Sequence, residues 1–388
     1  MSQRSTIKTR TVRAALESDT QHGSVVPPIH LTSTFAFSGY GEKRQYDYSR
    51  SGNPTRDALA GALAELEGGV GAVVTGSGMA AVGLLTQLFR PQQLAVVPHD
   101  CYGGTYRLFN ALANRGSLRV VFVDFGDAGA LARALADSPA MVWIETPSNP
   151  LLRIVDIAST AHAARDAGAL VVVDNTFLSP VWQRPLELGA DVVVHSTTKY
   201  LNGHSDVVGG VVISSTPQLQ EQLAWWANCT GVTGAAFDSY LTLRGLRTLH
   251  SRMRAHGENA ERVVARLAKH PAVSRVYYPG LPDHPGHAIA QRQQQGFGAM
   301  VSCELRGDLR NVRAFLGALD CFSLAESLGG VESLVAHPAS MTHAAMDETA
   351  RRVAGITDTL VRLSIGIEDA EDLVRDLDTA LAASMNAS

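Results

Sequence analysis

Residues 191–205 read DVVVHSTTKYLNGHS, and this stretch decides the expected fold class and chemistry. Its three consecutive valines are typical of a strand that is covered on both faces, as in the sheet of an α/β protein. Lys199 follows the end of that strand, among small hydroxyl side chains. Burial there disfavours the charged amine, and a neutral amine forms a Schiff base with an aldehyde or ketone. The stretch therefore predicts covalent chemistry at Lys199, whereas a lysine in arbitrary surroundings is usually a surface residue.

Apolar runs on both sides of this stretch extend the same pattern. From about residue 71 to 214 they alternate with helical segments, which indicates a mostly parallel sheet. The strands expected from these runs span 71–75, 94–97, 119–123, 141–145, 170–173, 191–194 and 207–213. Later in the chain, the expected helices 258–269, 309–319 and 370–381 alternate with fewer strands, such as 299–305 and 360–364. We therefore expect an extended arm (1–60), an α/β domain (61–256) and a smaller α+β domain (257–388).

Composition limits the possible partners and location. Hydrophobic residues make up 45% of the 388 residues and charged residues 18%, which is typical of a globular protein with a large interior. The net charge of -4 comes without a basic stripe, which argues against nucleic acid or an anionic membrane as a partner. No apolar run is long enough to span a bilayer, and the first residues lack the apolar core of a secretory signal. We expect a cytoplasmic protein.

The cysteines and histidines give no sign of a metal site. The four cysteines lie far apart, and the 13 histidines form no zinc-binding pattern on a helix. We therefore expect reduced thiols and no bound metal.

Residues 76–79 read GSGM and form a glycine-containing turn after the strand expected at 71–75. They open a helix that we expect to run to about Phe89, and the backbone N–H groups of such a helix N-terminus can bind a phosphate. The same turn with Ala81 also matches a dinucleotide fingerprint, for which Asp100 could bind the ribose. A structural turn without a ligand is the third interpretation.

Three single residues lie where a ligand could meet them. Asp174 closes an apolar strand, where a carboxylate could keep the ring nitrogen of a pyridine cofactor protonated, or simply cap a turn. Tyr102 stands beside two glycines and could stack on a planar ligand, or be an ordinary loop tyrosine. Arg362 is a lone charge in an apolar strand, where it could bind a carboxylate or face solvent.

Together these residues resemble the Cys/Met-metabolism family of pyridoxal-phosphate enzymes. The resemblance is carried by residues 191–205 and extends from YSRSGNPT (48–55) to RLSIGIE (362–368), which is almost the whole chain. It implies an α/β, fold-type-I pyridoxal-phosphate transferase with a mostly parallel seven-stranded central sheet and a smaller α+β C-terminal domain. It also implies a homotetramer, a dimer of dimers with shared active sites, in which the arm reaches a neighbouring subunit.

The resemblance assigns a role to individual residues. The catalytic residues would be Lys199, which carries pyridoxal 5'-phosphate as a Schiff base and moves protons, Asp174 on the ring nitrogen, and Tyr102 stacked on the ring. The residues implied to hold the phosphate are Ser77, Gly78, Met79, Ser196 and Thr198, together with Tyr48 and Arg50 from a neighbouring subunit, while Thr176 would bond near the ring. The residues implied to bind substrate are Arg362 on the α-carboxylate, with Asn149 and Ser327 nearby. Our hypothesis for Asp47 and Glu326 is that they place the amino group of the incoming cysteine or of cystathionine.

Within the family, the chain most resembles members that replace the acyl group of O-succinyl-L-homoserine by L-cysteine, giving L-cystathionine and succinate in methionine biosynthesis by transsulfuration. This likeness is carried by HDCYGG (99–104), WWAN (225–228) and AESLGG (325–330). Gly104 stands where methionine γ-lyases have a cysteine. Glu326 and Leu328 stand where bacterial cystathionine β-lyases have a tyrosine and a tryptophan.

Other functions stay open at this point. A cystathionine γ-lyase shares Glu326, an O-acylhomoserine sulfhydrylase belongs to the same family, and the acyl group could be acetyl or phosphoryl. A nicotinamide-dependent dehydrogenase is an alternative of a different class, built on the glycines at 76–81 and on Asp100. It leaves Lys199, Asp174 and Arg362 without a function. A non-catalytic binding module has no need for a lysine and an acid at neighbouring strand ends.

Overall fold

The computed structural model describes residues 5–344, 346 and 348–387. Its larger sheet has seven strands in the order β1-β7-β6-β5-β4-β2-β3. The strands are β1 (Gly71–Thr75), β2 (Leu94–Pro98), β3 (Arg119–Val123), β4 (Met141–Glu145), β5 (Leu170–Asp174), β6 (Val192–Ser196) and β7 (Gly210–Ser214). Strands β3, β2, β4, β5 and β6 pair in parallel, whereas β7 runs antiparallel to both β6 and β1. The predicted mostly parallel seven-stranded sheet is confirmed.

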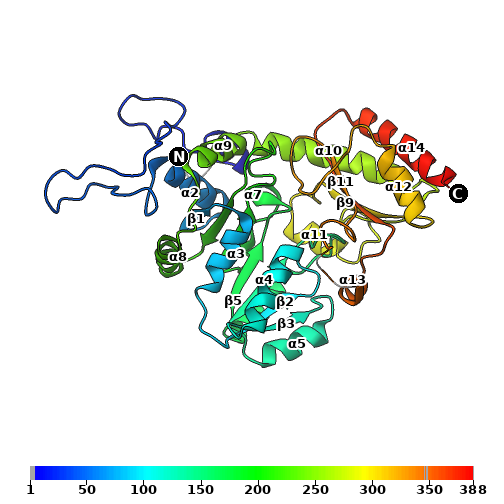
Figure 1. The fold of residues 1–388 in the computed structure, drawn as a ribbon, viewed down its shortest axis with the longest axis horizontal. Coiled ribbons are helices and arrows are strands. Elements are labelled where there is room, and N and C mark those ends of the chain that lie inside the picture. Colours follow the sequence, from blue (N-terminus) through cyan, green and yellow to red (C-terminus); the bar gives the residue numbers. More distant parts are fainter. Residues whose placement is uncertain (1–4, 345, 347, 388) are drawn as a thin grey trace.

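Helices cover both faces of this sheet, which explains its valine-rich strands (Figure 1). Val192 and Val194 of β6 belong to one hydrophobic cluster, and Val193 between them belongs to another. The helices of this half are α2 (Pro54–Glu67), α3 (Gly78–Thr86), α4 (Gly103–Asn114), α5 (Ala128–Ala136), α6 (Ile157–Asp166), α7 (Ser179–Trp182), the 3₁₀ helix η1 (Pro185–Leu188), α8 (Pro217–Thr230) and α9 (Ala236–Leu246). Both faces of β6 are therefore buried, as its sequence predicts.

The strand predicted at 207–213 begins later than expected, at Gly210. The preceding residues form the turns that carry Lys199. Thr198 fastens these turns, because its hydroxyl accepts a hydrogen bond from the N–H of Gly209 at 3.0 Å. The apolar residues Val207 and Val208 made this stretch resemble a strand, but they precede β7, and only Val207 is buried.

The C-terminal part contains a five-stranded sheet in the order β10-β11-β12-β9-β8. Its strands are β8 (Val273–Tyr277), β9 (Met300–Leu305), β10 (Ser323–Leu324), β11 (Leu334–Ala336) and β12 (Leu360–Ser364). Its helices are α10 (Leu249–Leu267), α11 (His287–Gln293), α12 (Leu309–Gly317), α13 (Glu348–Ala354) and α14 (Ala370–Asn386). The helices and strands predicted in this part are all present. Helix α10 begins at Leu249 rather than at residue 258, and α14 continues to Asn386 rather than ending at 381.

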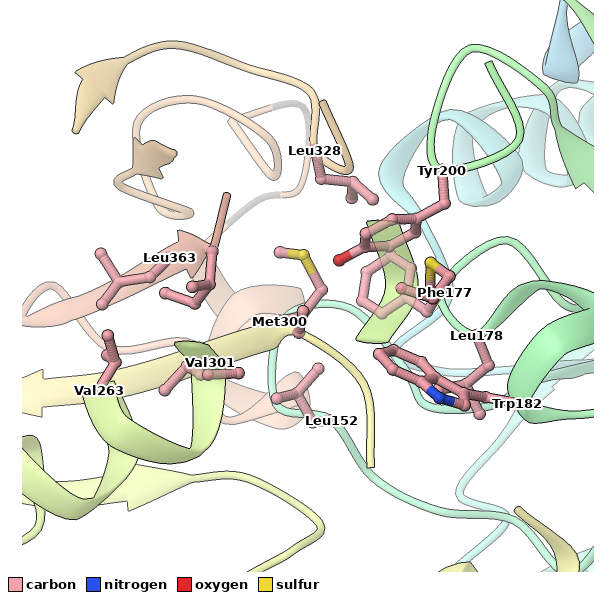
Figure 2. Packing of buried hydrophobic residues seen from close by; sticks show 14 of the residues in the cluster. Leu152, Phe177, Leu178, Trp182, Tyr200, Val263, Met300, Val301, Leu328 and Leu363 are labelled. Carbon is pink, nitrogen blue, oxygen red and sulfur yellow. The ribbon is translucent and has the colours of Figure 1, made fainter. Parts of the chain in front are cut away.

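Helix α10 crosses the domain boundary that we expected between residues 256 and 257. Its apolar face, including Val263, packs into one hydrophobic cluster with Val193 of the larger sheet and Leu363 of the smaller one. Figure 2 shows this shared core, where Val263, Val301 and Leu363 lie on one side and Phe177, Leu178 and Trp182 on the other. The two parts share one hydrophobic core, so this core does not mark a boundary between them. The division into three segments therefore stays a prediction.

The N-terminal segment lies apart from the sheets. After α1 (Ile7–Val12) the chain forms turns and two isolated β-bridges, and its loops project from the body of the molecule (Figure 1, dark blue). Helix α2 begins as predicted: the side chain of Asn53 accepts hydrogen bonds from the N–H groups of Thr55 and Arg56, and Pro54 is its first residue. Among the described residues, no helix is long and apolar enough to cross a membrane.

Candidate active site

A cavity of about 370 Å³ lies between the carboxyl ends of the parallel strands and the C-terminal part. Most of the residues predicted to form the site line it. They are Ser77, Gly78, Met79, Tyr102, Asn149, Asp174, Thr176, Ser196, Thr198, Lys199, Glu326, Ser327 and Arg362. Ligand sites in open α/β sheets lie at this edge, because the loops after neighbouring strands diverge there.

Lys199 lies three residues beyond the end of β6, in a turn closed by the hydrogen bond from its own N–H to the carbonyl of Ser196 at 3.3 Å. Its Nζ donates a hydrogen bond of 2.6 Å to Oγ of Ser327. Burial, helped by the positive charge of Arg362, lowers the pKa of Lys199 to about 8. A large fraction of this amine is therefore neutral at mildly alkaline pH, which is the form that reacts with an aldehyde.

Asp174 is the last residue of β5 and lines the same cavity. Its Oδ1 accepts a hydrogen bond of 3.0 Å from the N–H of Thr176, whose hydroxyl in turn accepts one from the N–H of Ser196. Burial raises the pKa of Asp174 in spite of the hydrogen bonds from Thr176. None of the ion pairs within the described residues includes Asp174, so a protonated ring nitrogen would give this carboxylate the cationic partner it lacks.

The N-terminus of α3 lies at the cavity, where the sequence predicts that a phosphate binds. The hydroxyl of Ser77 accepts a hydrogen bond from the N–H of Ala80 at 3.0 Å, and the first N–H groups of the helix have no partner within it. A Cβ at Gly78 would lie 2.8 Å from Cβ of Ser196, so only glycine lets the helix approach the end of β6 this closely. The side chains of Ser196 and Thr198 line the cavity beside this helix end, as a phosphate site requires.

Arg362 of β12 is almost completely buried, with 3% of its surface exposed. Its Nη1 donates to Oδ1 of Asn149 at 2.9 Å, and its Nη2 donates to the carbonyl of Ser327 at 2.8 Å. Its Nε is buried without a hydrogen-bond partner, and burial lowers its pKa to about 10. The interpretation as a solvent-facing arginine is wrong, because β12 is buried along its whole length. A buried guanidinium without a carboxylate fits an anionic substrate group.

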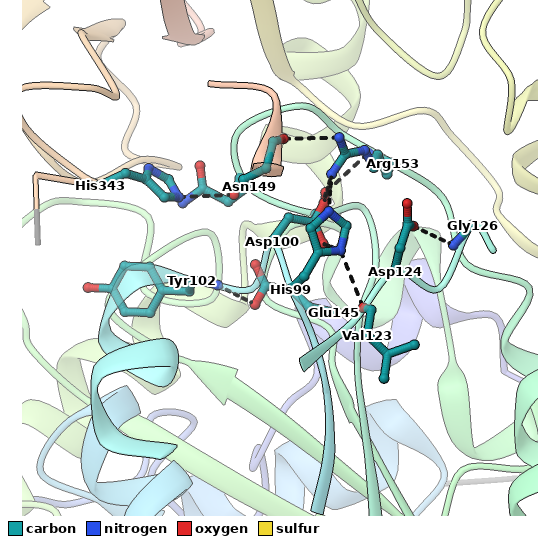
Figure 3. A network of polar contacts seen from close by, with 12 residues as sticks. His99, Asp100, Tyr102, Val123, Asp124, Gly126, Glu145, Asn149, Arg153 and His343 are labelled. Carbon is teal, nitrogen blue, oxygen red and sulfur yellow. Dashed lines mark hydrogen bonds and ion pairs between the residues drawn. The ribbon is translucent and has the colours of Figure 1, made fainter. Parts of the chain in front are cut away.

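Tyr102 precedes α4 at the edge of the cavity, and 44% of its surface is exposed. Its backbone N–H donates a hydrogen bond of 2.8 Å to Oε2 of Glu145 (Figure 3). A Cβ at Gly104 would lie 2.6 Å from Cε1 of Tyr102 and 2.9 Å from Sδ of Met79. The missing side chain at Gly104 therefore leaves room for the ring in this position.

Three predicted residues lie outside the cavity: Asp47, Tyr48 and Arg50, all on the N-terminal arm. Asp47 pairs with Lys43 at 2.8 Å. Arg50 donates to the carbonyl of Asn228 at 3.0 Å, and its guanidinium lies 5.8 Å from the centroid of the Tyr48 ring. Within a single chain these residues therefore do not complete the site.

Glu145 and Thr342 line the cavity but were missed from the sequence. Glu145 closes the strand next to β5, and this neighbour relationship depends on a strand order that the sequence does not show. A carboxylate at the end of an apolar strand was nevertheless a usable signal, because the same signal identified Asp174. Thr342 lies in a loop without a motif.

Asp100, the acid on which the dehydrogenase alternative depends, is engaged elsewhere. Its Oδ2 accepts hydrogen bonds of 2.8 Å from both Ser148 and Arg153. Asp100 and Arg153 are labelled in Figure 3. It lines a separate cavity of about 950 Å³, which also borders Glu145. The dinucleotide fingerprint therefore lacks an acid free to bind a ribose.

The polar groups that line the cavity match a phosphorylated pyridine aldehyde better than a metal ion. A helix end with adjacent hydroxyls, an amine of lowered pKa and a buried carboxylate lie along one cavity. In the part of the chain that the structure describes, no group of three or more His, Cys, Asp or Glu could hold a metal ion. The four cysteines are free. Pyridoxal phosphate fits these residues, with Lys199 for its aldehyde and Asp174 for its ring nitrogen.

Known proteins share both the sequence and this fold. Residues 8–382 match the model of the family described as Cys/Met metabolism PLP-dependent enzyme. The cystathionine gamma-synthase of Escherichia coli (strain K12) is 60% identical over 374 residues, which cover 96% of this chain and 97% of that protein. Two solved structures of the cystathionine gamma synthase of Xanthomonas oryzae pv. oryzae superpose with a TM-score of 0.98 and cover 99% of this chain and 100% of theirs. One, 58% identical, is in complex with aminoacrylate and cysteine, and the other, 59% identical, with cystathionine.

Proposed function

The chain belongs to the Cys/Met-metabolism family of pyridoxal-phosphate-dependent enzymes, and from this premise we propose that it is a cystathionine γ-synthase. It replaces the acyl group of O-succinyl-L-homoserine by L-cysteine and forms L-cystathionine and succinate. The 60% identity to the Escherichia coli synthase over nearly the full length supports this activity. So does the similarity to a synthase whose structures contain cysteine and cystathionine. The reaction belongs to methionine biosynthesis, which we place in the cytoplasm.

The observation that carries the proposal is the convergence of Lys199 and Arg362 on Ser327. The amine of Lys199 bonds to the hydroxyl of Ser327, and the guanidinium of Arg362 bonds to its carbonyl. A substrate whose α-carboxylate binds Arg362 therefore has its Cα close to the amine. This is the arrangement that a reaction beginning with removal of the Cα proton requires.

The residues of the site divide the chemistry between them. Once bound, pyridoxal phosphate accepts the electron pair that is left at Cα when its proton is removed. Asp174 keeps the ring nitrogen protonated, and Tyr102 covers one face of the ring. By moving protons at Cα and then at Cβ, Lys199 allows the γ-acyloxy group to leave and the thiolate of cysteine to form the C–S bond at Cγ.

Two positions favour the synthase over other members of the family. A cysteine at position 104, as in methionine γ-lyases, would displace the ring of Tyr102 from its observed place. Glu326 lines the cavity beside Arg362, where a carboxylate can bind the ammonium group of the incoming cysteine. The tyrosine that β-lyases have at this position has no charge to offer.

We also propose that the active site is completed by a second copy of the chain, in a homotetramer made of two dimers. The arm that carries Asp47, Tyr48 and Arg50 projects from the body, and apolar side chains along it are exposed, including 72% of Leu31. Exposed apolar surface of this kind is typical of an interface. Tyr48 and Arg50 would then reach the phosphate of a neighbouring site, and Asp47 its second substrate.

Product analysis tests the function directly. The holoenzyme is incubated with O-succinyl-L-homoserine, with and without L-cysteine, and the products are separated and identified. We expect cystathionine and succinate in the presence of cysteine. Formation of 2-oxobutyrate and ammonia alone would favour a γ-lyase. Parallel incubations with the O-acetyl and O-phosphoryl esters identify the acyl group, and sulfide in place of cysteine tests the sulfhydrylase alternative.

A further inference from the structure

Glu145 is a buried acid in the site that the proposed mechanism does not use. It is the last residue of β4 and lies opposite Asp174 of β5 in the parallel register. Both side chains line the cavity, and only 5% of the surface of Glu145 is exposed. Two carboxyl groups therefore stand side by side at the floor of the site.

The surroundings of this pair favour one charge rather than two. Asp100, from the loop after β2, adds a further negative charge, and Arg153 is directed to Asp100 rather than to Glu145. The ion pairs of the described residues include neither Glu145 nor Asp174. Burial and the negative charges of Asp174 and Asp100 raise the pKa of Glu145 well above its ordinary value, although the backbone N–H groups of Tyr102 and Asn149 act in the opposite direction. Adjacent buried carboxyl groups do not both ionise.

Glu145 also holds the residue expected to cover the cofactor ring. Its Oε2 accepts the hydrogen bond from the N–H of Tyr102, at the point where the chain turns into α4 (Figure 3). The side chain of Tyr102 makes no capping hydrogen bond to this helix, so the position of the turn depends on its backbone contacts. The Tyr102 ring in turn lies against Gly104. A shift of the Tyr102 N–H therefore moves the ring.

We propose that Glu145 is a positioning residue, which fixes the Tyr102 turn over the cofactor and does so as a neutral hydrogen-bonding group beside a charged Asp174. This role rests on the proposed function, because it matters only if a pyridine ring is bound under Tyr102. A second charge at position 145 would favour a proton on Asp174 and so weaken its hold on the ring nitrogen. A neutral acid avoids this conflict and keeps the hydrogen bond.

The proposal distinguishes substitutions that are similar in size. Glu145→Gln keeps a carbonyl oxygen that accepts from Tyr102, and it has no charge. Glu145→Leu fills the same space without an acceptor, and Glu145→Ala removes both volume and acceptor. The matched control is Glu304→Ala, which removes a carboxylate that accepts from Tyr277 on the smaller sheet, outside the site.

The experiment compares the purified holoenzymes by visible absorbance, by visible circular dichroism and by kcat and KM. For Glu145→Gln we expect a circular dichroism band and a spectral pH midpoint like those of the wild type, and kcat within about threefold. For Glu145→Leu we expect the band to fall by about half or more and kcat to fall at least about tenfold, while Glu304→Ala is unchanged. Glu145→Ala should resemble the leucine variant if it folds.

Each outcome bears on a separate claim. A shift of the spectral midpoint by about one pH unit in Glu145→Gln would mean that Glu145 is ionised, and would overturn the neutral state. A wild-type band in Glu145→Leu would overturn the positioning role. A wild-type protein that binds no pyridoxal phosphate would instead contradict the proposed function, before any variant is compared.

Discussion

Nζ of Lys199 lies 2.6 Å from Oγ of Ser327, so a residue of the C-terminal part holds the amine that follows β6 of the larger sheet. The chain between them includes α10, which spans the shared core of the two parts. The position of the amine therefore depends on how the two sheets pack. This dependence explains why a site built on a strand end also needs residues more than a hundred positions later.

Replacing Lys199 by alanine should abolish turnover. The variant loses both the amine that binds the aldehyde and the base beside Cα, and general acid–base catalysis alone contributes about 10²–10⁴-fold. We expect no cystathionine above background, and a cofactor that dialysis removes. Borohydride should reduce the yellow Schiff base of the wild type, which removes the colour and attaches the cofactor covalently. In the variant it should attach no cofactor. Lys269→Ala, at an exposed position after α10, is the control and should behave as wild type. Normal turnover by Lys199→Ala would contradict the covalent role.

The lowered pKa of Lys199 predicts how the apoenzyme captures its cofactor. Burial and Arg362 bring this pKa from 10.5 to about 8, so the amine loses its proton as the pH rises through about 8. The rate of capture, followed by stopped-flow absorbance, should therefore rise with pH and reach half its plateau near pH 8. In Arg362→Ala the midpoint should move upward, because a nearby positive charge is gone. A wild-type midpoint near 10 would mean that the amine is solvated.

Arg362→Ala should lower kcat/KM by an amount that corresponds to at least about 2 kcal/mol of lost transition-state binding. The reason is that a hydrogen bond to a charged group contributes about 1.5–3 kcal/mol. The loss should be similar for every substrate with an α-carboxylate. Arg262→Ala, which removes an exposed arginine paired with Glu371 on the surface, should leave kcat/KM unchanged. A value for Arg362→Ala within error of the wild type would show that another group binds the carboxylate.

The core and chemistry of this site were predictable because the deciding residues lie next to strands that are easy to recognise. Lys199 and Asp174 follow all-valine runs, and such runs form buried strands whose carboxyl ends meet at one edge of the sheet. The sequence alone did not decide whether the Arg362 side chain is buried or exposed, because the alternation of residues allows a strand with one solvated face. In the structure both faces of β12 are covered, because Val361 and Leu363 pack into the shared core and the Arg362 side chain lies against Asn149 and Ser327.

Other features depended on long-range pairing that no local pattern records. Glu145 faces Asp174 only because β4 and β5 are neighbours in the sheet. The antiparallel β7 lies between β1 and β6, an order that successive strand and helix signals do not specify. Asp47, Tyr48 and Arg50 lie outside the cavity of the single chain, so their roles stay predictions.

Gly104→Ala should disturb the Tyr102 ring. A Cβ there meets Cε1 of Tyr102 at 2.6 Å, and overpacking of this kind costs about 1–3 kcal/mol. We expect weaker cofactor binding, measured by equilibrium dialysis, and a changed visible circular dichroism band. The control is Gly61→Ala in α2, where no atom lies within 4 Å and alanine should stabilise the helix by about 0.5–1 kcal/mol. Equal cofactor binding in both variants would show that the ring adapts to the added methyl group.

Glu326→Ala should raise the apparent KM for cysteine and leave that for O-succinyl-L-homoserine nearly unchanged. Glu326 lines the cavity together with Ser327 and Arg362, and the ion pairs among the described residues do not include its carboxylate. It is therefore available for the ammonium group of the second substrate, and loss of a charged hydrogen bond corresponds to about a tenfold increase in KM. Glu326→Gln should have an intermediate value, because it keeps an acceptor without the charge. Initial rates with each substrate varied in turn make this measurement. An unchanged KM for cysteine in Glu326→Ala would remove the carboxylate from this role and leave the binding of that amino group to the arm residue Asp47.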